Sequence, residues 1–207
     1  LSPSPSSALY RPPPTTSLSA FAYVFNEYLS HHQSRSLSIS DLESRLRLGG
    51  EEVGRRVLEL AACRGGEGVV TGGVVGSGRG GDSGSSHSSH GSSSHGGYSK
   101  RKFMREVRVI GMLKFVSETL WRSLFGKVAD SLERSVDDGR EYMIHDRDPP
   151  MNVYASVPQD MRGLNPASFV SGVIKGALEG GGFPCEKVEA HTVGGEGGGG
   201  ENTVFLV

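Results

Sequence analysis

The first residues with a chemical pattern lie at 76–81, whose sequence is Gly-Ser-Gly-Arg-Gly-Gly. They match the G-x-G-x-x-G fingerprint of dinucleotide-binding loops and follow two valines, Val74-Val75. In that fingerprint the loop opens a helix whose N-terminus holds the pyrophosphate, but here it runs into Ser/His/Gly repeats. We therefore interpret the match as a coincidence of low-complexity sequence and predict no cofactor.

Histidines of the same tract could in principle collect zinc together with residues of the preceding segment. The candidates are His87, His90, His95, His31, His32 and Cys63. An ordered zinc site needs fixed ligand spacing and hydrogen bonds that hold each ligand in place. A Gly/Ser-rich tract does not supply these, so we predict no metal site.

A nucleophilic enzyme would need a Ser or Cys on a tight turn with a His beside it. Cys185 follows Pro184 at the start of a predicted strand, and His191 lies six residues further along that strand, too far for contact. His145 is expected on the solvent side of another strand. The sequence contains no G-x-S-x-G, H-E-x-x-H or P-loop motif, so we predict that the chain is not an enzyme.

Composition excludes several further classes. A formal net charge of −1 argues against a nucleic-acid binder, which would normally carry a basic excess. Two cysteines, Cys63 and Cys185, are too few for a disulfide framework, so intracellular thiols are expected. No apolar run approaches the length needed to span a bilayer, and the first residues lack the apolar core of a secretory signal. A soluble, cytosolic protein is the expectation.

One basic cluster consists of Lys100-Arg101-Lys102 together with Arg105 and Arg108. It lies near the start of the most apolar helix that the sequence predicts. Two interpretations stay open: a plain solvated flank, or a surface that faces an acidic partner or anionic lipid.

That apolar helix is predicted over 105–133 and contains the only Trp of the chain. Its apolar side is predicted to include Val107, Ile110, Leu113, Leu120 and Leu124. A helix that is apolar around most of its circumference is normally buried between other elements. We expect it to be the central core helix.

Composition also divides the chain. Residues 1–16 are rich in Pro and Ser and are expected to be disordered. Residues 17–207 are expected to form one domain, which a disordered insertion at 64–100, with 13 Gly and 10 Ser in 37 residues, interrupts. A Gly-rich loop at 194–201 is expected to join the last two strands.

Two helices precede the insertion. Ser17 can cap the first, which carries Phe21 and Phe25, and Ser38 or Ser40 can start the second. The second helix has a narrow apolar seam at threes and fours, formed by Ile39, Leu42, Leu46, Val53, Val57 and Leu60. Such a seam suits packing of helix against helix, and Gly50 and Gly54 would let a partner backbone approach closely.

In the second half of the chain the spacing of the apolar residues changes. Residues 127–134 are predicted as a short helical piece, and strands are predicted at 140–146, 151–157, 185–193 and 202–207. Asn165-Pro166 is typical of a helix start, and Gly172 with Gly176 gives that helix a flat face. The predicted class is α+β, with an antiparallel sheet and its helices on one face.

Several motifs together resemble the subunit-five type of TRAPP (transport protein particle) core protein, a member of the Bet-type family. They cover about residues 17–63 and 103–193 in the family's order, and their spacing matches through the second half. The principal ones are Leu18-Ser19-Ala20-Phe21-Ala22, Leu120-Trp121 followed by Leu124-Phe125-Gly126-Lys127, Ala129-Asp130, Val153-Tyr154-Ala155-Ser156-Val157-Pro158, Leu164-Asn165 followed by Ala167-Ser168-Phe169, and Gly182-Phe183-Pro184.

The resemblance implies four main helices on one face of a four-stranded antiparallel sheet. It also implies a non-catalytic scaffold in a tethering complex that acts as guanine-nucleotide exchange factor for Rab-type GTPases in endoplasmic reticulum to Golgi transport. The implied partners are a Bet-type subunit three, bound through the first two helices, and a sedlin-type subunit two. Peripheral association with cis-Golgi and endoplasmic-reticulum-derived membranes through the complex is also implied.

On these grounds we expect a subunit interface that the first two helices form from Phe21, Phe25, Leu42, Leu46, Val53, Val57 and Leu60. Ordinary packing within the chain is the alternative for the same seam. A small-molecule sensor that binds lipid or tetrapyrrole is the alternative function, because related folds can enclose a cavity among their helices. The insertion at 64–100 and the loop at 194–201 depart from the family pattern.

Overall fold

The computed structural model describes residues 16–64, 106–136, 139–157, 159–194 and 202–207. The predictions of a disordered tail at 1–16, an insertion at 64–100 and a Gly-rich loop at 194–201 therefore lie almost wholly outside the described residues. So do the Gly-rich motif at 76–81, the histidines at 87, 90 and 95, and the basic run at 100–102.

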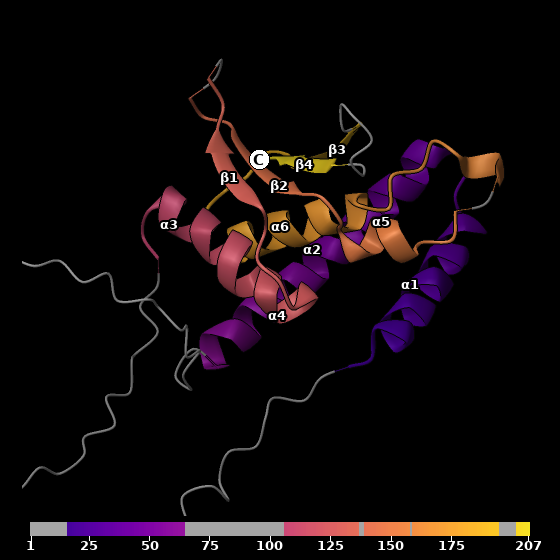
Figure 1. Ribbon diagram of the computed structural model, residues 1–207, viewed down its shortest axis with the longest axis horizontal. Helices are drawn as coiled ribbons and strands as arrows, with labels where there is room; N and C mark the ends of the chain where they lie inside the picture. The colour runs from indigo at the N-terminus through magenta and orange to yellow at the C-terminus, as the bar shows by residue number, and fades with distance from the viewer. Residues whose placement is uncertain (1–15, 65–105, 137–138, 158, 195–201) are drawn as a thin grey trace, which may run out of the picture.

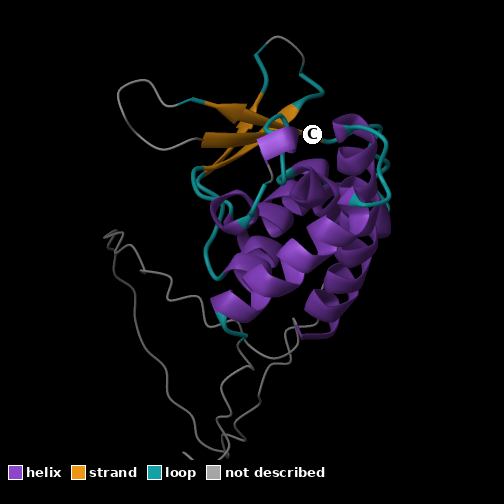
Figure 2. Ribbon diagram, turned by 90° about the vertical axis from the view of Figure 1, so that its right-hand side faces the viewer, coloured by secondary structure: helices purple, strands orange, loops and turns teal. Residues whose placement is uncertain are grey.

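The described residues form a four-stranded antiparallel sheet with the helices gathered on one face of it (Figures 1 and 2). The strand order is β1-β2-β4-β3. The strands are β1 (Ser131–Arg134), β2 (Tyr142–Asp146), β3 (Glu189–Val193) and β4 (Asn202–Leu206). The predicted α+β class, with a four-stranded antiparallel sheet covered by helices on one face, is confirmed.

The first two helices begin where the sequence predicts. Helix α1 (Leu18–Gln33) is capped by Ser17, whose hydroxyl oxygen accepts a hydrogen bond of 3.2 Å from the Ala20 N–H. Helix α2 (Ile39–Arg64) follows Ser38, whose hydroxyl accepts a bond of 3.2 Å from the Asp41 N–H. Each cap satisfies one of the N–H groups that have no partner within the helix.

The central helix is shorter than the predicted 105–133. It consists of α3 (Val109–Lys114), a π-helical segment η2 (Phe115–Leu120) and α4 (Trp121–Phe125). It ends at Gly126, whose φ of 74° is the left-handed conformation that glycine adopts without strain. Leu113, Leu120 and Trp121 are buried as expected, but the side chains of Val107 and Ile110 are 83% and 50% exposed.

The π-helical segment has a visible structural consequence. Backbone hydrogen bonds there run to the fifth residue back, which changes the pairing of the carbonyls. The Ser117 carbonyl accepts a hydrogen bond of 2.9 Å from the Ala129 N–H, beyond the end of α4. This bond holds the chain against the helix as it turns toward β1.

Two local predictions were wrong. Residues 127–134 do not form a helical piece, because Ser131–Arg134 is strand β1 and pairs with β2, with Ser131 opposite His145. Residues 151–157 do not form a strand, because Pro150–Tyr154 is the short helix α5, with Pro150 in its first turn. The predicted strand at 185–193 is confirmed only over β3, from Glu189 onward.

Helix α6 (Ser168–Gly180) is the most deeply buried helix, and it crosses α2 at very short range. A Cβ atom added at Gly50 would come well inside 3.0 Å of the Phe169 carbonyl oxygen, and one added at Gly172 equally close to the Arg47 carbonyl oxygen. Gly54 and Gly176 make the same kind of approach one turn further along. The backbone that the α2 glycines admit is therefore that of α6 in the same chain.

Candidate interaction face on helices α1 and α2

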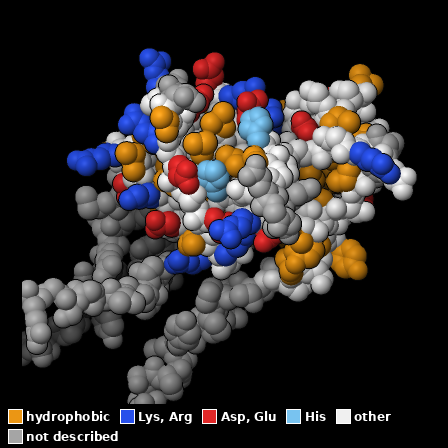
Figure 3. All heavy atoms as spheres, turned by 45° about the horizontal axis from the view of Figure 1, so that its top comes forward, with side chains coloured by type: hydrophobic (Ala, Val, Ile, Leu, Met, Phe, Trp, Pro, Cys, Tyr) orange, Lys and Arg blue, Asp and Glu red, His pale blue; other side chains and the backbone are white. Residues whose placement is uncertain are grey.

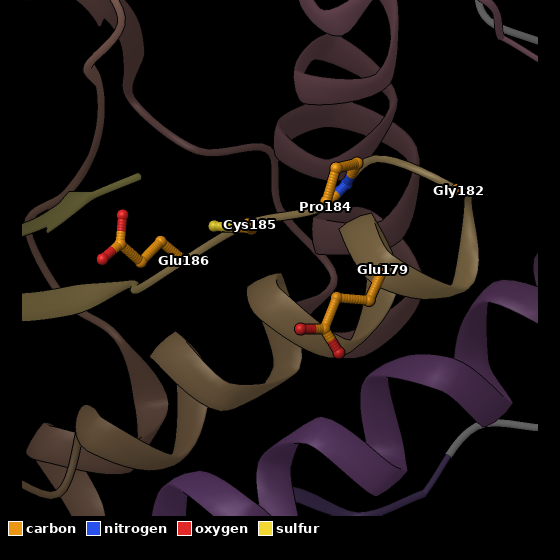
Figure 4. Close-up of a pocket in the computed structure, with 5 residues that line it drawn as sticks. All are labelled: Glu179, Gly182, Pro184, Cys185 and Glu186. Carbon is orange, nitrogen blue, oxygen red and sulfur yellow. The ribbon is translucent and has the colours of Figure 1, made fainter.

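Cys185 lies in an open surface hollow of about 600 Å³ between the end of α6 and the start of β3 (Figure 4). Glu179, Gly182, Pro184 and Glu186 line the hollow with it. The thiol is half-buried, and its sulfur lies 3.5 Å from the Lys187 carbonyl oxygen. Burial raises the pKa of the Cys185 thiol above its ordinary value, which disfavours the nucleophilic thiolate. The prediction that Cys185 and His191 lie on one strand was wrong, because β3 begins only at Glu189.

The two histidines of the sheet lie on the face turned away from the helices. His145 alternates with the buried residues Ile144 and Asp146, so its side chain points to the opposite face, as predicted. Its Nε2 atom lies 4.0 Å from a Glu133 carboxylate oxygen. Among the described residues, no group of three or more His, Cys, Asp or Glu side chains could hold a metal ion.

The residues predicted to form a subunit interface divide by burial. Phe25, Leu42 and Leu46 are 5%, 0% and 0% exposed, so they pack inside this chain and offer almost no area to a partner. Leu42 and Leu46 form a small cluster with Leu29 and Leu164, among others, whereas Phe25 belongs to the main core. These three positions fit the alternative of ordinary packing within the chain.

The remaining predicted positions lie at the border of the core. Phe21, Val53 and Val57 are half-buried against the main core cluster, and Leu60 is 51% exposed. Helix α1 adds Val24, which is 70% exposed, so apolar side chains continue from the core border onto the surface. We name Phe21 and Val24 on α1, together with Val53, Val57 and Leu60 on α2, the helix face, although the first turns of α1 and the last turns of α2 lie apart (Figure 1). It can bind an apolar surface, and it contains no group suited to covalent chemistry.

Comparison with known proteins identifies the family. The profile described as transport protein particle (TRAPP) component matches residues 21–207. The chain belongs to the TRAPP component family. It is 38% identical over 184 residues to trafficking protein particle complex subunit 5 of Homo sapiens, which covers 89% of this chain and 79% of that one. It is 33% identical over 190 residues to subunit 5 of Dictyostelium discoideum, covering 92% and 83%.

A solved structure confirms the fold of this TRAPP component. The crystal structure of a trafficking protein particle complex subunit 3 from Naegleria fowleri, covalently bound to palmitic acid, superposes with a TM-score of 0.58. The match covers 92% of this chain and 95% of that one at 15% sequence identity. At that identity the likeness shows the TRAPP fold alone.

The TRAPP motif around Trp121 and Lys127 has a structural role here. Asp146 on β2 has no exposed area, and it accepts a hydrogen bond of 2.8 Å from the Trp121 indole N–H. The Lys127 ammonium donates to the other oxygen of the same carboxylate and, at 3.1 Å, to the Asp148 carbonyl. A buried carboxylate therefore joins the end of the central helix to the sheet. The sequence signal that could have identified Asp146 is its position two residues after Ile144, because residues two apart on a strand lie on the same face of the sheet.

A second motif residue, Asn165, holds the start of α6 in place. Its side-chain oxygen accepts a hydrogen bond of 3.1 Å from the Ala167 N–H, while its side-chain nitrogen donates at 2.9 Å to the Ala190 carbonyl on β3. Its backbone N–H donates at 3.0 Å to the Glu43 carboxylate on α2. The predicted helix start is thus also a junction between α2, α6 and the sheet.

Proposed function

We propose that this chain is a non-catalytic scaffold subunit of the TRAPP complex, of the subunit-five type. The observation that carries the proposal is the family match over residues 21–207, together with 38% identity to the human subunit 5. Support for a non-catalytic role comes from the chemistry-bearing residues. Cys185 keeps its proton because its thiol is half-buried, and it has no histidine beside it on a shared strand.

The proposed partners are other TRAPP subunits: a Bet-type subunit three on the first two helices and a sedlin-type subunit two elsewhere. The helix face supports the first contact, because among the described residues its apolar side chains Val24 and Leu60 are 70% and 51% exposed. Leu42 and Leu46 support that contact only indirectly, by holding α2 in position.

The assembled complex, in this proposal, acts as guanine-nucleotide exchange factor for Rab-type GTPases in endoplasmic reticulum to Golgi transport. This chain would contribute architecture and no catalytic group to that exchange. Its proposed place is peripheral, on cis-Golgi and endoplasmic-reticulum-derived membranes. Within the part of the chain that the structure describes, no helix is long and apolar enough to cross a bilayer.

The alternative of a lipid or tetrapyrrole sensor is not favoured. The hollow at Cys185 is open to solvent and lies beside two carboxylates, Glu179 and Glu186, which is a poor environment for an acyl chain. Palmitic acid is bound in the Naegleria fowleri subunit 3, which is another type of TRAPP subunit.

Co-purification of partner subunits under native conditions tests the scaffold role, and Leu60→Asp tests the helix face. Leu48→Asp is the matched control: the same residue type on the same helix, 64% exposed where Leu60 is 51% exposed. Twelve residues of helix separate the two by roughly 120° around the α2 axis, so they face different directions. We expect Leu60→Asp to weaken binding of the Bet-type subunit by about 2 kcal/mol or more, because a carboxylate would be buried against an apolar surface.

Both variants should unfold at the same urea concentration as the parent, since both side chains are largely exposed. Equal binding by the two variants would contradict the helix face as the interface. If no TRAPP subunit co-purifies with the parent chain at all, the scaffold proposal itself fails.

A further inference from the structure

The start of the central helix exposes apolar and basic side chains together. Val107, Val109 and Ile110 are 83%, 47% and 50% exposed; Arg108 lies between the two valines, and Lys114 follows Ile110 by four residues. Figure 3 shows Lys and Arg side chains beside hydrophobic ones at the left-hand end of the molecule, where α3 lies in Figure 1, together with Asp and Glu side chains. Neighbouring large aliphatic side chains that are exposed to this extent indicate an interaction site.

A shallow hollow of about 450 Å³ opens between these residues and the sheet. Its lining combines the apolar groups of Val109, Ile110 and Tyr142 with the cations Arg108 and Lys114. Within the described part of the chain, neither of these two cations forms an ion pair. We name the six residues 107–110, 114 and 142 the α3 patch.

The α3 patch itself contains two cations, Arg108 and Lys114, and no carboxylate. The Arg134 guanidinium lies 5.9 Å from the centre of the Tyr142 ring and adds a third cation. Carboxylates lie nearby as well: Glu106 lies against Gly111, Glu118 follows Lys114 by four residues along the helix, and Glu141 directly precedes Tyr142. The sequence before Glu106 is also basic, since no acidic residue occurs between Asp82 and Glu106 while four basic residues lie at 100–105.

We propose that the α3 patch binds the surface of an anionic phospholipid bilayer directly. The cations match the negative headgroups, and the exposed valines and isoleucine can enter the boundary between headgroups and acyl chains. A bilayer surface can bind apolar and basic side chains together without needing shape complementarity. A folded protein partner would need it, and an open, shallow surface provides little. The inference extends the membrane association of the proposed function from the complex as a whole to a named surface of this subunit.

Vesicle sedimentation of the full chain tests the proposal, with vesicles of phosphatidylcholine and phosphatidylserine in equal parts and vesicles of phosphatidylcholine alone. We expect binding to the anionic vesicles only, and weaker binding as salt is added. A basic residue near an anionic surface contributes about fivefold to partitioning, so Arg108→Glu with Lys114→Glu should lower it by at least about 30-fold. Glu106→Gln should raise it severalfold, because it removes the negative charge of the carboxylate that lies against Gly111.

The matched control is Arg147→Glu with Arg162→Glu, which changes net charge equally at two exposed positions outside the α3 patch. The control should keep most of the vesicle binding of the parent. Equal binding to neutral vesicles, or an equal loss in the control, would overturn the proposal.

Co-purification separates this inference from the scaffold role. The charge-reversed variant should retain its TRAPP partners while it loses vesicle binding. If it instead keeps vesicle binding and loses a partner subunit, the α3 patch binds an acidic protein and the lipid proposal is wrong. Loss of both, with an unchanged urea midpoint, would also contradict a role confined to lipid.

Discussion

Two substitutions of the same type, Gly172→Ala on α6 and Gly111→Ala on α3, should change stability in opposite directions. Both glycines lie inside helices with ordinary negative φ angles, so alanine gains about 1 kcal/mol of helix propensity at either position. The surroundings of the added methyl group differ. At Gly172 it would overlap the Arg47 carbonyl on α2, whereas at Gly111 it would meet only the end of the flexible Glu106 side chain.

The size of each stability change depends on whether the atoms that meet the added methyl group can move away. Glu106 is exposed and can rotate away at little cost, so Gly111→Ala should be neutral or stabilising by up to about 1 kcal/mol. The Arg47 carbonyl is part of a helix that is closely packed against α6, so relief requires separating two backbones. Overpacking typically costs 1–3 kcal/mol and sometimes more, which outweighs the propensity gain. We expect Gly172→Ala to destabilise by about 2 kcal/mol.

Urea denaturation followed by far-ultraviolet circular dichroism measures both effects. The slope of free energy against urea should stay constant, because neither substitution changes the area exposed on unfolding, and only the midpoint should move. A midpoint for Gly172→Ala equal to or above that of the parent would refute the close backbone contact between α2 and α6. A fall for Gly111→Ala of similar size would show that the two environments do not differ as described.

Two further predictions concern single side chains. Lys127→Met should lower the free energy of unfolding by about 3 kcal/mol in urea titrations. The reason is that the carboxylate of Asp146 has no exposed area and would keep only the Trp121 N–H and a backbone N–H as hydrogen-bond partners. A loss below about 1 kcal/mol would contradict this account. Burial, followed by nearby cations, lowers the pKa of His32 below its ordinary 6.5, so the unfolded chain binds a proton at a higher pH than the folded chain does. The free energy of unfolding should therefore decline below about pH 6.5. In thermal melts taken at a series of pH values, His32→Gln should make this decline with falling pH less steep.

Helix starts and close helix crossings were readable in the sequence because their determinants are local. Ser17 and Ser38 bond to N–H groups three residues away, so the caps need no distant partner. Glycines spaced by four on two helices indicated that backbones approach closely. The sequence did not show that the glycines of α2 face those of α6 in the same chain, and the seam was therefore open to an interface interpretation.

The strands depended more on tertiary structure. Ser131–Arg134 becomes a strand because β2 supplies its hydrogen-bond partners, and nothing in its own pattern required this. The pattern of 151–157 suggested a strand, yet Pro150 in a first turn was compatible with the short helix that forms.

The sequence by itself determined the family, the fold class and the long helices α1, α2 and α6, since several motifs in order are more specific than any one of them. Only the tertiary structure decided which apolar residues are available to partners. Leu46 and Leu60 belong to the same seam at helical spacing, but one has no exposed area and the other is half exposed. The reason is that exposure depends on which segments pack over a residue, and those segments lie far away in the chain.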